Sequence, residues 1–145
     1  MPKRASHKLN ATQHAADLPP ALQHTRFRSQ LEIRFALALE ARKLRWFYEP
    51  ERIARYLIDF YLPDSRSWVE VKGVVSTRDH RLLREAAVLL AAARKHRLYM
   101  WTEKGAYLVT AGDFAPLPLA DFWAILTPPP AAPPSLDVPP HTESG

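Results

Sequence analysis

Residues 55–72 read RYLIDFYLPDSRSWVEVK, and this stretch decides the expected fold. Its two arms, Arg55 to Leu62 and Ser67 to Lys72, are rich in aromatic and aliphatic residues and have the character of β-strands. Between them, Pro63-Asp64-Ser65-Arg66 has the composition of a tight turn. We therefore predict a β-hairpin closed by a four-residue loop.

A four-residue loop fixes which residues of the hairpin lie opposite each other. The expected pairs are Leu62 with Ser67, Tyr61 with Trp68, Phe60 with Val69, and Asp59 with Glu70. Strand alternation sends Glu70 and Lys72 to one face, while Val69 and Val71 point to the other. Two carboxylates and an amine are therefore expected to converge.

The opposed carboxylates of Asp59 and Glu70 create a conflict that a bound cation would remove. Like charges directly opposite each other destabilise a strand pair, and burying them beside apolar residues adds a desolvation cost. Hard divalent ions such as Mg²⁺ bind carboxylate and water oxygens, often together with substrate phosphate. The pair therefore predicts a divalent metal site, with Lys72 supplying an adjacent positive charge.

The sequence before the hairpin predicts a helix followed by a short strand. Residues Phe27 to Leu44 are expected to form a helix lying on a core, with Glu32 just beyond the edge of its apolar stripe. That stripe consists of Phe27, Leu31, Phe35, Ala38 and Leu39. A short aromatic strand, Trp46 to Glu49, is then ended by Pro50.

The sequence after the hairpin predicts a second helix and two further strands. Thr77 is the expected cap of a helix from Arg78 to Lys95. Its buried stripe is expected to consist of Leu82, Leu83, Ala86, Ala87, Leu90 and Ala93. The remaining expected elements are the strands Leu98 to Thr102 and Ala106 to Thr110, a turn at Lys104-Gly105, and a last helix from Leu119 to Leu126.

Together these elements predict an α/β fold in which helices flank a mixed β-sheet. Strand, helix and strand between Trp68 and Trp101 are expected to form a right-handed crossover between parallel neighbours. We expect this domain to occupy residues 25–126. Residues 1–24 have the composition of a basic flexible arm, and residues 127–145, with their many prolines, that of a disordered Pro-rich tail.

The bulk composition favours a polyanionic partner. The 145 residues carry a formal net charge of +5, which favours nucleic acid over acidic small molecules. The chain has no cysteine, which excludes disulfides and thiolate chemistry and fits a reducing compartment. The first residues lack the apolar core of a signal peptide, and no apolar run approaches a membrane span. We therefore expect a soluble, cytoplasmic protein that binds DNA and no membrane.

The order and spacing of the acidic residues resemble the PD-(D/E)XK nuclease superfamily. The matching features are a helix bearing Glu32, then Tyr48-Glu49-Pro50, then Ile58-Asp59, and finally Glu70-Val71-Lys72. The pattern is similar to small phage-type endonucleases, including Holliday-junction resolvases, and to the nuclease subunit of Tn7-like transposons. One position departs from it, because Ile58 stands where the family often has proline.

The resemblance implies a restriction-endonuclease-like core of αβββαβ order and Mg²⁺-dependent hydrolysis of DNA, with Mn²⁺ as a substitute ion. It implies Asp59 and Glu70 as metal ligands, Lys72 as the catalytic lysine, and Glu32 as a further acidic residue that completes the site. Lys72 would act as a point charge on the scissile phosphate, or would orient and help to deprotonate the attacking water. The Pro63-Asp64 pair makes Asp64 the competitor of Asp59 if the hairpin loop is shorter than four residues.

Two glutamates keep a second interpretation. Ser29-x-x-Glu32 has the spacing of a capping box at a helix start, so the Glu32 carboxylate serves either the cap or the site. Glu49 either braces the site from behind the metal ligands or is a surface residue at a strand end. Both alternatives stay open for each residue at this point.

Basic residues on both helices are candidate phosphate contacts, although each also fits a solvated surface. They are Arg26, Arg28 and Arg34 near the first helix, and Arg78, Arg81, Arg84 and Lys95 on the second. The four tryptophans are expected to pack in the core. Trp68 is the one with an alternative, stacking on a base, because it shares a strand face with Glu70.

We therefore expect a metal-dependent DNA endonuclease. The first alternative is a DNA-binding module of the same fold whose cutting is performed or licensed by a partner protein. The second is a basic interaction domain in which Asp59, Glu70 and Lys72 form a structural ion pair. A homodimer would suit an enzyme that cuts both strands of a duplex.

Overall fold

The computed structural model of this protein describes residues 18–73 and 76–129. The helices are α2 (Pro20–Gln23), α3 (Gln30–Ala41), α4 (Thr77–Arg94) and α5 (Leu119–Leu126), with a 3₁₀ turn η2 (Pro63–Ser65). The strands are β1 (Phe47–Tyr48), β2 (Arg52–Ile53), β3 (Tyr56–Leu57), β4 (Phe60–Leu62), β5 (Ser67–Val71), β6 (Arg97–Thr102), β7 (Gly105–Val109) and β8 (Phe114–Leu117). Residues 1–17 of the expected basic arm and 130–145 of the expected Pro-rich tail lie outside the described residues. The end of the arm was predicted wrongly as flexible, because α2 forms there and its Leu22 is buried in the core.

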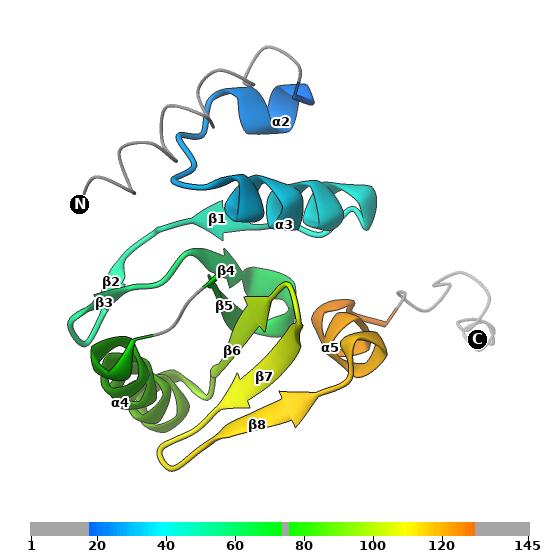
Figure 1. The fold of residues 1–145 in the computed structure, drawn as a ribbon. Helices are drawn as coiled ribbons and strands as arrows, with labels where there is room; N and C mark the ends of the chain where they lie inside the picture. The colour runs from blue at the N-terminus through cyan, green and yellow to red at the C-terminus, as the bar shows by residue number, and fades with distance from the viewer. Residues whose placement is uncertain (1–17, 74–75, 130–145) are drawn as a thin grey trace, which may run out of the picture.

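Six of these strands form one mixed sheet in the order β1-β4-β5-β6-β7-β8, while β2 pairs with β3 in a separate two-stranded sheet (Figure 1). Strands β5 and β6 run parallel and are joined through α4, and the other neighbouring strands are antiparallel. The predicted α/β class, with a mixed sheet flanked by helices and parallel strands on either side of the second helix, is confirmed. None of the described helices combines the length and apolar character needed to span a bilayer.

Two apolar clusters lie on opposite faces of the sheet. Val69 and Val71 of β5 belong to the cluster that includes Phe35 of α3 and Phe122 of α5. Trp68 belongs to the other cluster, which α4 covers. Because Trp68 is only 1% exposed, it is a core residue, and the alternative that it stacks on a base is wrong. The other three tryptophans are half-buried against the first cluster or at its edge.

Three of the four predicted pairs of the hairpin are confirmed, and the fourth, Asp59 with Glu70, lies beyond the end of the ladder. The paired residues are Phe60 with Val69, Tyr61 with Trp68, and Leu62 with Ser67. Arg66 closes the four-residue loop in the left-handed conformation, with φ of 52°. Asp64 lies in this loop, where it is exposed and pairs with Arg45 at 2.7 Å. Asp64 is therefore held at the turn end of the hairpin and is not the competitor of Asp59.

Both long helices begin where a serine caps them, which shifts their predicted starts. Ser29 Oγ accepts a hydrogen bond from the N–H of Glu32, so Phe27 lies before α3 and not within it. Ser76, and not Thr77, caps α4. A serine hydroxyl that accepts from the third helical N–H is a common helix start, and it decides both boundaries.

The buried face of α3 also differs from the prediction. It consists of Glu32, Ile33, Phe35, Ala36 and Leu39. The predicted stripe was counted from Phe27, which is buried but is not helical, and the true face is therefore rotated relative to it. Leu31 and Ala38 are only half-buried, and on α4 the last predicted stripe residue, Ala93, is exposed.

Three features of the strands were not predicted. The expected strand Arg55 to Leu62 is divided between β3 and β4, which belong to different sheets. The short strand β2 precedes it, and β8 adds an edge strand to the main sheet. Pro116 within β8 is tolerated there because an edge strand needs backbone partners on one side only.

Candidate active site

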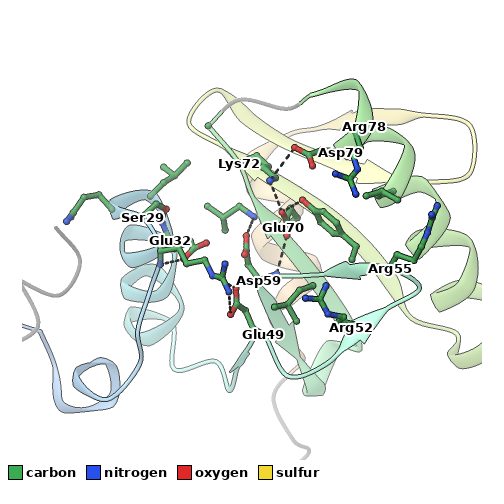
Figure 2. A pocket seen from close by; sticks show the side chains of 18 of the residues that line it. Ser29, Glu32, Glu49, Arg52, Arg55, Asp59, Glu70, Lys72, Arg78 and Asp79 are labelled. Atoms are coloured by element: carbon green, nitrogen blue, oxygen red, sulfur yellow. Dashed lines mark hydrogen bonds and ion pairs between the residues drawn. The ribbon is translucent and has the colours of Figure 1, made fainter. Parts of the chain in front are cut away.

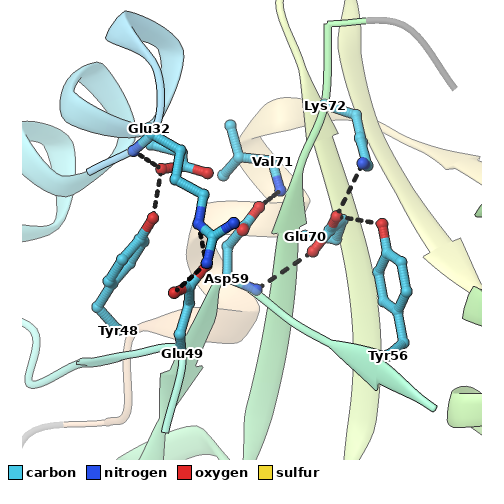
Figure 3. Close-up of polar contacts among 9 residues, drawn as sticks. Glu32, Tyr48, Glu49, Tyr56, Asp59, Glu70, Val71 and Lys72 are labelled. Carbon is cyan, nitrogen blue, oxygen red and sulfur yellow. Dashed lines mark hydrogen bonds and ion pairs between the residues drawn. The ribbon is translucent and has the colours of Figure 1, made fainter. Parts of the chain in front are cut away.

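Strands β4 and β5 part at Asp59, and carboxylates replace the backbone ladder at that point. The N–H of Asp59 donates to Glu70 Oε1 at 3.2 Å, and the N–H of Val71 donates to Asp59 Oδ2 at 2.8 Å (Figure 3). The regular pairing of the two strands ends at Phe60 and Val69. Side-chain oxygens thus take up N–H groups that a longer ladder would have paired with carbonyls, which explains the interruption of the predicted strand.

Glu32 approaches the same place from the first turn of α3. Its Oε1 accepts from the N–H of Arg28 at 2.7 Å and from the hydroxyl of Tyr48 at 2.6 Å. Both of these bonds use the same oxygen, and the carboxyl group of Glu32 also lies close enough to that of Asp59 to raise its pKa. One carboxylate oxygen therefore supports the helix start while the other is available to the site. The two interpretations of Glu32 are compatible with each other.

Lys72 lies between two carboxylates. Its Nζ is 3.3 Å from Glu70 Oε2 and 3.5 Å from Oδ2 of Asp79, a residue of the first turn of α4. Burial by itself lowers the pKa of Lys72, but Glu70, Asp79 and Asp59 together raise that pKa above its ordinary value. The amine is therefore a fixed positive charge beside the site at neutral pH.

Three side chains that hold the site together were missed by the sequence analysis: Tyr48, Tyr56 and Asp79. The hydroxyl of Tyr56 donates to Glu70 Oε2 at 2.6 Å, as that of Tyr48 does to Glu32. Burial and the neighbouring glutamate raise the pKa of each phenol, so both remain protonated donors. The alternation of the predicted strand does not indicate a role for Tyr56, because Tyr56 belongs to β3 and the chain leaves β3 before it enters β4. Asp79 carried a usable signal, since acidic residues favour the first turn of a helix.

The three acids of the site are buried at an energetic cost. Glu32 is 5% exposed, Asp59 6% and Glu70 2%. Burial, followed by repulsion from Glu70 and Glu32, raises the pKa of Asp59 well above its ordinary value. Burial also raises the pKa of Glu70, against the opposing influence of Lys72 and the Tyr56 hydroxyl. One amine does not balance three buried acids, and such uncompensated charge is more typical of a functional site than of a structural ion pair.

These side chains line an open cleft of about 1010 Å³ (Figure 2). The arginines that line it are Arg28, Arg52, Arg55 and Arg78. Arg55 pairs with Glu85 at 3.0 Å, whereas neither Arg52 nor Arg78 forms an ion pair within the part of the chain that the structure describes. Arg52 and Arg55 come from the β2–β3 hairpin, so the sequence analysis did not place them at the site.

Glu49 is part of the cleft lining and not an isolated surface glutamate. Its carboxylate forms an ion pair with Arg28 at 2.9 Å, and its side chain is 16% exposed. Burial raises the pKa of Glu49, while the pairing with Arg28 opposes that shift. The structure therefore favours the interpretation in which Glu49 braces the site by fixing Arg28 at the rim.

The other basic residues predicted to contact phosphate lie outside the cleft. Arg34 is exposed and pairs with Glu103 at 2.7 Å. On α4, Arg81 and Lys95 are exposed and Arg84 is half-buried, and the cleft lining described by the structure includes none of the three. Lys95 lies at the opposite end of α4 from the cleft residues Arg78 and Asp79, and contacts of these basic residues to a longer nucleic acid remain a prediction.

The donor set decides what kind of metal ion would fit. Within the described residues, no group of three or more acidic, histidine or cysteine side chains is arranged to hold a metal ion by itself. Asp59 and Glu70 nevertheless present adjacent buried oxygens in a site with surplus negative charge. Mg²⁺ is commonly bound through one or two carboxylates, with water and substrate phosphate completing its shell. The residues present fit that mode of binding and not a closed protein cage.

No protein-family model, curated protein or solved structure matches this chain. The resemblance to the nuclease superfamily therefore rests on the motif residues themselves.

Proposed function

We propose that this protein is a metal-dependent endonuclease that hydrolyses DNA phosphodiester bonds. The observation that supports this most strongly is the convergence of Asp59, Glu70 and Lys72 where β4 and β5 part, inside a cleft with arginines on its rim. The order α3-β1-β4-β5-α4-β6, with the β2–β3 hairpin inserted, also supports a restriction-endonuclease-like core, for which the resemblance implies αβββαβ.

The acids of the site have a shared role in this proposal. Asp59 and Glu70 would hold Mg²⁺, and Glu32 would add its other oxygen or bind the waters of the ion. When bound, the ion supplies Lewis acidity that offsets the negative charge developing on the phosphate. The hydroxyls of Tyr48 and Tyr56 keep the two glutamates oriented, because each donates a short hydrogen bond to one of them.

The surroundings of Lys72 favour one of the two roles that the sequence allowed. The carboxylates around it raise the pKa of Lys72, which favours a protonated amine, although a metal ion on Asp59 and Glu70 would offset part of their charge. A fixed ammonium group beside a phosphate stabilises the charge that develops in the transition state. We therefore propose phosphate stabilisation as the main role of Lys72, with orientation and deprotonation of the attacking water as the alternative.

The rim arginines would position the nucleic acid. Arg52 and Arg78 are available to phosphate groups, and Arg28 is already oriented by Glu49. Contacts of arginine with phosphate supply affinity and register without reading the base sequence. The cleft is therefore expected to bind DNA with little sequence preference.

One observation favours a second candidate, a DNA-binding module whose cutting depends on a partner protein. Lys72 is engaged by both Glu70 and Asp79, which leaves one of the three N–H groups of its ammonium for a phosphate and restricts where the amine can move. A partner that moves α4 would release it. The two candidates differ in whether the purified chain cuts DNA without help.

The test compares wild type with Asp59→Asn, Glu70→Gln and Lys72→Ala on supercoiled, linear and four-way-junction DNA, with Mg²⁺, Mn²⁺ or chelator. We expect nicking by wild type with either ion, no nicking with chelator, and a loss of about 100-fold or more in each variant. Lys104→Ala is the matched control, because Lys104 is an exposed lysine of the β6–β7 turn.

The outcomes separate the candidates. Equal nicking by wild type and Lys72→Ala would contradict the proposed nuclease, since a contaminant would then explain the activity. Intact DNA binding without any nicking by wild type would favour the second candidate, which depends on a partner protein.

A further inference from the structure

A second groove lies along β1, the edge strand of the main sheet. It has a volume of about 930 Å³ and is formed by the end of α3, the strand β1 and the segment that precedes α3. Its lining includes the basic residues His24, Arg26, Lys43 and Arg45 and the aromatic residues Trp46, Phe47 and Tyr48. Of these residues, Tyr48 also contacts the acidic site, because its hydroxyl donates to Glu32.

This groove, which we call the β1 groove, borders the cleft at two points of the chain. Arg26 lines the groove, and Arg28, two residues later, lines the cleft. Tyr48 lines the groove while its hydroxyl holds Glu32 in the cleft, and its neighbour Glu49 lines the cleft. A strand that leaves the cleft past Arg28 and Glu49 therefore comes directly to the β1 groove.

The β1 groove has a positive charge that is largely available. Neither Arg26 nor Lys43 forms an ion pair within residues 18–73 and 76–129, and both are exposed. Arg45 pairs with Asp64 at 2.7 Å, but both side chains are largely solvent-accessible, and such pairs contribute little. The groove can therefore attract phosphate groups with at least two unpaired cations.

Two of the aromatic rings of the β1 groove are fixed in place. The indole N–H of Trp46 donates to Glu40, the acidic residue of the lining, at 2.7 Å, and the ring centroids of Trp46 and the buried Phe27 are 6.0 Å apart. Tyr48 packs edge-on against Phe27 at 4.9 Å. Phe47 differs from Trp46 and Tyr48: it is 51% exposed, and no ring contact of Phe47 is found within the described residues. Rings that are already ordered contact a base at a small entropic cost.

We infer that the β1 groove binds the unpaired nucleotides of a nucleic acid strand that continues out of the cleft. Arg26 and Lys43 would contact its phosphates, and the aromatic side chains of β1 its bases. Aromatic residues in a basic groove bind single strands because every nucleotide carries both a phosphate and a π face. This inference rests on the proposed function, since it requires that the cleft binds nucleic acid. It names the substrate as a duplex with an unpaired extension.

The test measures the binding of labelled DNA to the full chain by fluorescence anisotropy, in chelator so that no cutting occurs. One duplex is blunt, and two others carry a short oligothymidine extension at the 3′ or the 5′ end. Wild type is expected to bind one extended duplex about tenfold more tightly than the blunt duplex, which corresponds to stacking of about one base.

Variants in the groove and in the cleft separate the two contacts. The double variant Arg26→Glu/Lys43→Glu is expected to remove the advantage of the extension, and Phe47→Ala to reduce it about threefold. All three residues are exposed, so the fold should persist, and circular dichroism checks this. Arg78→Glu is the control in the cleft, and it should weaken the binding of blunt and extended duplexes alike.

Two results would overturn the inference and leave the proposed nuclease intact. One is equal affinity of wild type for blunt and extended duplexes. This result would favour a peptide strand, and not nucleic acid, as the partner that binds at the edge of β1. The other is an advantage of the extension that survives in the double variant. Failure of wild type to bind any of the duplexes would instead overturn the proposed function itself.

Discussion

The carboxylate of Asp59 accepts a hydrogen bond from the backbone N–H of Val71 at 2.8 Å. The contact replaces a backbone rung of the sheet and fixes Asp59 beside Glu70. The N–H group of Val71 does not neutralise the charge of Asp59, and this residue is buried, with only 6% of its surface exposed. The backbone therefore fixes the position of the Asp59 side chain, while ionisation of its buried carboxyl group reduces the stability of the folded protein.

Asp59→Asn should stabilise the protein at neutral and mildly alkaline pH. Burial and the repulsion from Glu70 and Glu32 raise the pKa of Asp59 in the folded state above its value in the unfolded state. Stabilisation from this group is therefore fully present below the ordinary pKa of aspartate and is lost as the pH rises through the raised pKa. Asparagine keeps an acceptor for Val71 without the charge, and we expect a gain of about 1–3 kcal/mol.

Urea unfolding at several pH values measures this effect, and the gain should shrink as the pH falls. Asp64→Asn is the matched control. Hydrogen bonds from Arg45 lower the pKa of Asp64, so its charge is favourable and asparagine should not stabilise the protein there. Destabilisation by Asp59→Asn at every pH would show that the buried charge is not costly.

Ser29→Ala and Glu32→Gln should separate the helix cap from the site. Loss of the Ser29 hydroxyl removes the cap of α3 and should reduce the free energy of unfolding by about 1 kcal/mol, with cleavage by the folded protein retained. Glutamine at position 32 keeps an acceptor for Arg28 and Tyr48 but loses the charge. It should therefore change stability less and reduce cleavage about tenfold or more.

Urea unfolding and initial nicking rates, measured on the same preparations, check both parts of this prediction. Full cleavage by Glu32→Gln would assign Glu32 to the helix cap alone. Loss of cleavage by Ser29→Ala at a temperature where it is folded would show that the two roles cannot be separated.

Tyr56→Phe should weaken the site through Glu70. The variant keeps the ring, over which Lys72 Nζ lies 5.7 Å from the centroid, and removes only the hydroxyl that donates to Glu70. We expect a loss of about 1–2 kcal/mol in the free energy of unfolding and about tenfold in cleavage. Tyr107→Phe is the control, because no hydrogen bond of the half-buried Tyr107 hydroxyl is found within the described residues. Equal behaviour of the two variants would remove Tyr56 from the site.

Arg52→Ala and Arg78→Ala should each reduce the salt dependence of DNA binding. An arginine that contacts one phosphate releases about one counterion, so its removal should lower the slope of log K against log salt concentration by about one. Anisotropy titrations at several salt concentrations, in chelator, provide the slopes. Arg97→Ala, an exposed arginine outside both the cleft and the β1 groove, should leave the slope unchanged. Unchanged slopes for Arg52 and Arg78 would place the DNA elsewhere on the protein.

The sequence was sufficient for the hairpin and for the core of the site. Turn length determines the register as far as Phe60 and Val69, and this directs Asp59 toward Glu70, although their final contact is made by carboxylate hydrogen bonds and not by the ladder. The interruption after β3 could not be seen, because Ile58 is fully buried in the cluster that contains Trp68, as a residue of an unbroken strand would be. Burial is continuous from Ile58 to Phe60, so it does not mark the break, which the hydrogen bonds of the carboxylates reveal.

The parts that could not be predicted depend on contacts distant in the sequence. Tyr48 meets Glu32 only because β1 returns beneath α3, and Tyr56 meets Glu70 only because the β2–β3 hairpin folds over the cleft. The same hairpin brings Arg52 to the rim. The local sequence pattern does not predict these contacts, because they depend on the tertiary fold and not on the spacing of residues along the chain.

Titration of the protein with Mn²⁺, followed by the electron paramagnetic resonance signal of the free ion, tests the central claim most directly because it requires no substrate. The account predicts that wild type and Asp64→Asn bind Mn²⁺, that Mg²⁺ competes for the site, and that Asp59→Asn and Glu70→Gln lose affinity by about tenfold or more. Equal uptake by all four proteins, or no uptake by wild type, would contradict a metal site at Asp59 and Glu70.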